Sequence, residues 1–139
     1  MKKLLICIGA LLICAPILIA QAPVQTNIGV TSTIVANNTT PVTIKSTRGT
    51  VYNIEGFNKS TTPAYIKLYN ILPTCGTTIP VARYQIPAAN GLSGNILTIN
   101  NVNGDAYFDG IYLCVTTGIA DNDTTAPAAS TYIVNIHFK

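Results

Sequence analysis

Few residues in this sequence are of the types that carry out chemistry. The only histidine, His137, sits in an alternating apolar run, on the face opposite Val134, Ile136 and Phe138. A catalytic histidine needs a nucleophile or a carboxylate beside it, and the sequence nominates neither. Serine-hydrolase elbows, zinc-protease helices, phosphate loops and dinucleotide fingerprints are missing as well. We therefore expect a structural role for His137 and a protein that is not an enzyme.

The segment Asp121–Thr124 packs two carboxylates and two neutral oxygens into four residues. Ca²⁺ takes six to eight oxygen ligands, but the glycine and the distal glutamate of an EF-hand loop are missing here. Asp and Asn are also common in ordinary turns, because their side chains bond their own backbone. The sequence favours a turn, with an ion held by Asp121 and Asp123 as the open alternative. No cofactor is expected.

The four cysteines fall into two groups. Cys7 and Cys14 lie in an apolar N-terminal segment, whereas Cys75 follows a Pro-Thr turn and Cys114 lies in a strand-like run. In an oxidising compartment the second pair could form a disulfide that closes a loop of about 40 residues. The alternative is two unrelated cysteines, one buried and one on a loop. A metal site is disfavoured, because no CxxC motif or neighbouring histidine is present.

Residues 1–22 have the pattern of an export segment. Lys2 and Lys3 precede the uncharged run Leu4–Ala20, and Ala20-Gln21-Ala22 is typical of a signal-peptidase site. An uncleaved membrane anchor is the alternative, since about 17 residues is the short limit for a span. We expect an extracellular, periplasmic or cell-surface protein that contacts membrane only through this segment, and only if the segment stays uncleaved. Beyond it, six basic residues face five acidic ones, which disfavours nucleic acid as a partner.

The remaining chain reads as an extended arm followed by one β domain. Residues 23–40 are uncharged and rich in Thr and Asn, and we expect them to add as a strand to their own sandwich or to a neighbour's. From residue 41 onward, short β-branched and aromatic runs alternate with turn residues, and no helical period occurs. The expected strands span 42–44, 50–57, 64–69, 81–86, 95–100, 106–117 and 131–138.

This pattern predicts an all-β protein: a single antiparallel β-sandwich, jelly-roll or immunoglobulin-like, over residues 41–139. The turn Asn103-Gly104-Asp105 is expected to separate two of its strands. Alternation in 64–69 places Tyr65, Lys67 and Tyr69 on one face, which we expect to be an exposed contact surface. Only 9% of residues are charged, which suits packing in a homo-oligomer or a larger assembly.

Several blocks from Ile44 to Lys139 support a family resemblance. They are KSTRGTVY (45–52), AYIKLYN (64–70), YQIP (84–87), FDGI (108–111), VTTGIADNDTT (115–125) and YIVNI (132–136). In their order and spacing the chain resembles small bacteriophage proteins found among virion structural genes. The resemblance implies a compact β-sandwich and a decoration or tail-associated role in the virion, with no catalytic residues to carry over.

The export segment and the arm depart from that family and leave two other functions open. One is an exported adhesin or fibre subunit of a cell that assembles by strand addition. The other is a secreted binding module, such as one that binds carbohydrate on aromatic side chains. The lack of tryptophan disfavours the carbohydrate module.

Overall fold

The computed structural model describes residues 31–34, 38–91 and 93–139. The export segment and most of the arm, with Cys7, Cys14, Ile28 and Val30, lie outside the described residues. Eight strands occur in the described ranges: β1 Thr31–Ile34, β2 Asn38–Lys45, β3 Gly49–Asn58, β4 Ala64–Tyr69, β5 Ala82–Ile86, β6 Asn95–Tyr107, β7 Ile111–Thr116 and β8 Tyr132–Phe138.

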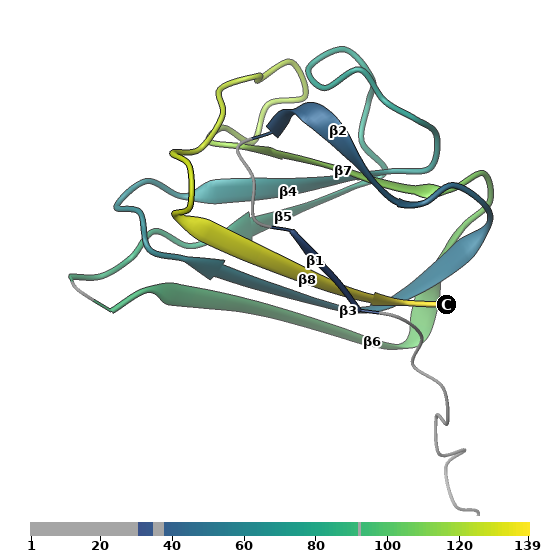
Figure 1. Ribbon diagram of the computed structural model, residues 1–139, viewed down its shortest axis with the longest axis horizontal. Coiled ribbons are helices and arrows are strands. Elements are labelled where there is room, and N and C mark those ends of the chain that lie inside the picture. The colour runs from purple at the N-terminus through teal and green to yellow at the C-terminus, as the bar shows by residue number, and fades with distance from the viewer. Residues whose placement is uncertain (1–30, 35–37, 92) are drawn as a thin grey trace, which may run out of the picture.

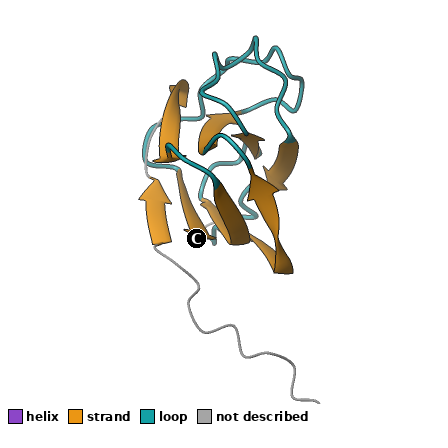
Figure 2. Cartoon of the chain, turned by 90° about the vertical axis from the view of Figure 1, so that its right-hand side faces the viewer, coloured by secondary structure: helices purple, strands orange, loops and turns teal. Residues whose placement is uncertain are grey.

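The strands form two antiparallel sheets that pack face to face. Sheet A has the order β1-β8-β3-β6, and sheet B has the order β2-β7-β4-β5 (Figure 1). The side view shows strands joined by loops, without a helix in the described chain (Figure 2). The predicted all-β sandwich is confirmed.

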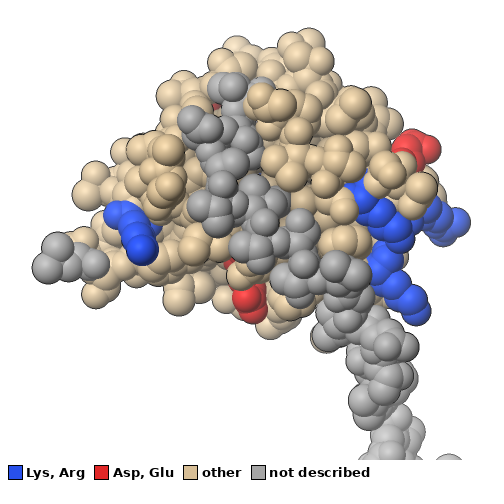
Figure 3. Space-filling model, in the orientation of Figure 1, with Lys and Arg blue, Asp and Glu red and all other residues tan. Residues whose placement is uncertain are grey.

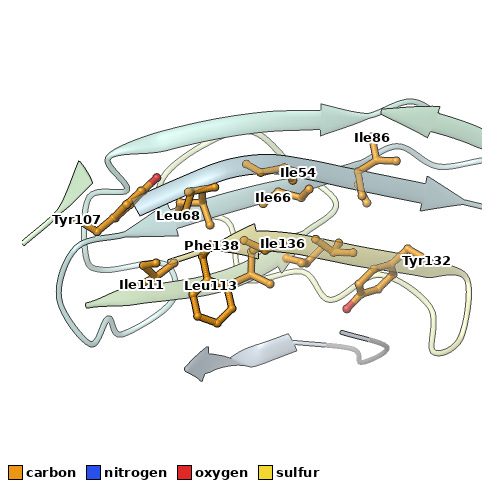
Figure 4. Close-up of a cluster of buried hydrophobic side chains, with 14 residues drawn as sticks. Ile54, Ile66, Leu68, Ile86, Tyr107, Ile111, Leu113, Tyr132, Ile136 and Phe138 are labelled. Atoms are coloured by element: carbon orange, nitrogen blue, oxygen red, sulfur yellow. The ribbon is translucent and has the colours of Figure 1, made fainter. Parts of the chain in front are cut away.

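Alternating side chains of both sheets fill the space between them. In β8, Tyr132, Val134, Ile136 and Phe138 all point into the core, as the sequence pattern predicts. They meet Ile54 of β3 and the aliphatic residues of β4 and β7 (Figure 4). Strand β7 is buried along its whole length: one face packs in the core between the sheets, and Tyr112 and Cys114 on the other face belong to a second buried cluster. Burial of these β-branched and aromatic side chains is the main force that holds the sheets together.

The predicted division at Asn103-Gly104-Asp105 is wrong. Strand β6 runs on to Tyr107, and the chain reverses only afterwards, before β7 begins at Ile111. The turn residues instead form a bulge: residues 101–104 lie opposite the single residue 52, between the pairs Asn53–Asn100 and Val51–Asp105. Gly104 has φ +72°, and a Cβ on it would lie 2.3 Å from Cγ2 of Thr50. Only glycine fits this bulge without strain.

Part of the segment expected to be an arm lies within the sandwich. Strand β1 pairs antiparallel with β8 of its own chain, with Thr31 opposite His137 and Ile34 opposite Val134. Strand β2 begins at Asn38, two residues before the expected end of the arm. The described part of the arm thus follows the intramolecular alternative of the two that the sequence allowed.

Candidate functional site

The contact surface expected on β4 does not exist as predicted. Lys67 and Tyr69 are 0% exposed, and only Tyr65 keeps part of its surface in solvent. Their face of β4 does point away from the core, but loops that leave β4 and β7 fold back over it. A disulfide and a lysine side chain hold these loops in place.

The disulfide joins Cys75 of the β4–β5 loop to Cys114 of β7, with a Cα–Cα distance of 6.1 Å. The predicted pairing is confirmed. Around it, Tyr69 and Tyr112 complete a second small core on the outer face of sheet B. The Tyr69 hydroxyl is buried without a hydrogen-bond partner among the described residues. Burial raises the pKa of this phenol, since the charged form would lose its water.

Lys67 holds the loop after β7. Its ammonium donates to the backbone carbonyl oxygens of Ala120 at 2.6 Å and Asp123 at 3.2 Å. Burial lowers the pKa of Lys67, while the carboxylates of Asp123 and Asp121 act in the opposite direction. The buried ammonium therefore ties the loop after β7 to the outer face of sheet B.

The carboxylates of the Asp121–Thr124 segment are also used within the protein. Asp121 forms an ion pair with Arg83, whose Nε donates to Oδ1 at 2.6 Å. Asp123 Oδ2 accepts from the backbone N–H of Gly118 at 2.7 Å. Burial alone would raise the pKa of Asp123, but its hydrogen bonds to Thr125, Gly118 and Thr116 together lower it. These contacts favour the turn over the ion site.

The other chemistry-bearing residue of the sequence, His137, lies on the outer face of sheet A. It is partly exposed, in line with Asn135 and Ile133 and opposite Asn53 of β3. Among the described residues, no group of three or more His, Cys, Asp or Glu side chains is placed to hold a metal ion.

The outer face of sheet A carries apolar side chains that no loop of the described part of the chain covers. Three of these side chains, here called the sheet A surface, are Phe57, Ile96 and Ile133. They line a shallow hollow of about 470 Å³, whose other lining residues are Glu55, Gly56, Thr98 and Asn135. Ile96 is 65% exposed and Ile133 is 36% exposed. The Lys59 ammonium lies 5.8 Å from the centre of the Phe57 ring. In the view of Figure 3, most of the described surface is uncharged, with basic side chains toward its left and right ends and acidic ones at its lower edge and upper right.

A second hollow, here called the end hollow, opens between the edge strands β5 and β6. It measures about 480 Å³ and is lined by Asn70, Val81, Ala82, Tyr84, Asp105, Ala106, Tyr107 and Phe108. Asn70 ties its rim together, because its side-chain oxygen accepts from the backbone N–H of Phe108 at 2.5 Å. Sequence reasoning missed this site. The available signals were Pro80 before one edge strand and Asn-Gly-Asp inside the other.

No protein-family model matches this chain, and no curated protein matches it at a significant level. Within the described residues, no helix is long and apolar enough to cross a membrane.

Proposed function

We propose that this protein is a non-enzymatic structural protein that acts by packing its sheet A surface against copies of itself or a larger assembly. The supporting observation is that exposed Ile96 and Ile133 flank the partly exposed Phe57 on three neighbouring strands. Contiguous apolar surface of this kind marks protein contacts more often than isolated exposed residues do. On its opposite face, the same sandwich buries its outward side chains under cross-linked loops.

The proposed setting is a virion, as a decoration or tail-associated component, or the surface of a cell. The virion setting is supported by the sequence blocks between Ile44 and Lys139 that resemble small bacteriophage proteins. The disulfide and the well-filled core suit a small domain that must persist outside a cytoplasm.

Sedimentation velocity of the purified protein over a range of concentrations tests the assembly step. Ile96→Lys should weaken self-association by about tenfold or more, because a charge would have to be buried in the contact. Ile119→Lys is the matched control, since Ile119 is 59% exposed and lies outside both hollows. A protein that neither self-associates nor remains on purified particles would contradict the proposal, as would equal effects of the two variants.

Strand addition in an exported adhesin or fibre is the second candidate, favoured by one feature of sheet A. Strand β1 covers only four residues of β8, from Val134 to His137, and a neighbour's arm could occupy the same place. Thr33 and Asn135 are paired in this register. With cysteines at both positions, strand addition predicts disulfide-linked ladders on non-reducing gels. A product of monomer size would exclude exchange between chains.

A further inference from the structure

The end hollow lies between two edge strands of unequal length, β5 and β6. Strand β5 begins at Ala82. Two residues earlier, Pro80 has no N–H to donate to a neighbouring strand. The N–H of Val81 donates to the carbonyl oxygen of Leu68. Strand β6 continues to Tyr107 on the facing sheet. The last part of β6 forms one side of the hollow, and Ala82 and Tyr84 of β5 lie on the other side.

A carboxylate points into this opening from a core-facing position. Asp105 pairs with Val51, and directly paired residues of an antiparallel ladder share a face. Val51 is 2% exposed and belongs to the core. Asp105 thus lies where the pattern of the sheet calls for an apolar side chain.

The bulge in β6 is what brings Asp105 there. Continuing the register from the Asn53–Asn100 pair without a bulge would place Val102, not Asp105, opposite Val51. In the observed register Val102 is 72% exposed and Asp105 has the inward position. Asp105 Oδ1 accepts from Nδ2 of Asn101 at 2.7 Å, which fixes the carboxylate. Bulges commonly re-aim a side chain near a functional site, and this one exchanges an apolar residue for an acid.

Aromatic side chains surround the carboxylate. Burial raises the pKa of Tyr84, and the nearby Asp105 carboxylate adds to this effect. Burial also raises the pKa of Tyr107, with smaller contributions from Tyr84 and Asp105. Both phenols therefore stay protonated at neutral pH. At the rim, Phe108 is 62% exposed, and the guanidinium of Arg48 lies 5.2 Å from its ring centre. The ring is thus held in place while much of its surface remains open.

We propose that the end hollow binds a neutral saccharide. A carboxylate and the half-buried phenol of Tyr84 beside an exposed aromatic ring match a ligand with many hydroxyl groups and apolar C–H faces. The carboxylate accepts from sugar hydroxyls, the Tyr84 phenol donates and accepts, and the ring of Phe108 packs on a sugar face, while Tyr107, 3% exposed, forms the floor of the hollow. No Lys or Arg lines the hollow, and Asp105 would repel an anion. Its volume falls within the range of small-molecule sites.

The test is an NMR titration of the full, disulfide-bonded chain with the methyl glycosides of glucose, galactose and N-acetylglucosamine. At least one sugar should shift the amide resonances of residues 81–84 and 105–108 in a saturable way. Asp105→Asn keeps the shape and the bond from Asn101 but removes the charge, and it should weaken binding about tenfold. Phe108→Ala, at an exposed site, should weaken it similarly.

Glu55→Gln is the matched control, because it removes a carboxylate from the other hollow and should leave the sugar affinity within about twofold. Tetramethylammonium chloride is titrated in parallel, since aromatic rings and a carboxylate can also bind organic cations. Shifts with this cation and none with the sugars would overturn the proposal. So would a silent sugar panel, or sugar shifts that Asp105→Asn leaves unchanged. Self-association is measured separately, so either proposal can fail alone.

Discussion

The outer faces of the two sheets are built from strands with the same alternating pattern, but one face is buried and the other is exposed to solvent. On sheet B, the outward residues Lys67 and Tyr69 of β4 are 0% exposed. On sheet A, the outward residues Ile96 of β6 and Ile133 of β8 are 65% and 36% exposed. The polar or amphipathic residues are therefore covered, and the aliphatic ones are open to solvent.

The difference shows that cross-links between distant segments, rather than the hydrophobicity of a strand face, decide which face is buried here. The Cys75–Cys114 disulfide fixes the loop after β4 on sheet B. Lys67 fixes the loop after β7 through two carbonyl oxygens. An uncovered apolar face is then available for a partner, which is the basis of the proposed assembly.

Removing the disulfide should have the largest effect on the covered face. Replacing Cys75 and Cys114 together with Ser should lower the free energy of unfolding by about 4 kcal/mol, because the bridge closes a loop with a sequence separation of 39. Urea denaturation measures this loss. Reduced wild-type protein is the control and should show the same midpoint. A loss below about 1 kcal/mol would mean that the bridge does not hold the cover.

Removing the buried ammonium should have the next largest effect. Lys67→Met leaves the carbonyl oxygens of Ala120 and Asp123 without their donor and should cost about 2 kcal/mol. Lys59→Met, at an exposed position next to the sheet A surface, should change stability by less than about 0.5 kcal/mol. Hydrogen exchange should increase in residues 117–125 only for Lys67→Met. Equal effects of the two substitutions would remove the contrast between the faces.

Alkaline pH should act on the covered tyrosine. The folded pKa of Tyr69 is raised by burial, so the folded chain keeps a proton that the unfolded chain releases near pH 10. Stability from this group is complete below pH 10 and is lost as the pH rises through the folded pKa. Tyr69→Phe should therefore flatten the fall in urea midpoint above pH 10.

At pH 8, Tyr69→Phe should be neutral or stabilising by up to about 1 kcal/mol, because the hydroxyl it removes is buried without a partner among the described residues. A marked loss of stability at pH 8 would show that this hydroxyl is hydrogen-bonded in solution.

The open face should give the smallest change in stability. Ile133→Thr alters a side chain that already contacts solvent, so the free energy of unfolding should move by less than about 0.5 kcal/mol. Ile136→Val, on the core face of the same strand, should cost about 1 kcal/mol. Thermal and urea unfolding of the two variants check the order. A larger loss for Ile133→Thr would indicate that a partner or another segment covers this face.

Strand periodicity carried much of the fold prediction. The run Tyr132–Phe138 shows its buried face directly in the sequence, because alternate residues of a strand must point to opposite sides. The disulfide could be expected from the two cysteines left after the export segment, although spacing alone left it open. The candidate site was not predictable in the same way, because the end hollow is lined by residues from three segments that are distant in sequence.

By itself, the sequence determined the all-β class and the two faces of each strand, because both follow from the local conformation of a few consecutive residues. Only the tertiary structure decided that Lys67 is buried, since its acceptors in Ala120 and Asp123 lie 53 and 56 residues away along the chain. The same holds for Asp105, whose inward position depends on the register of β6 against β3. The alternation of side chains along a strand shows which of them share a face. What covers that face depends on contacts between segments that are distant in sequence.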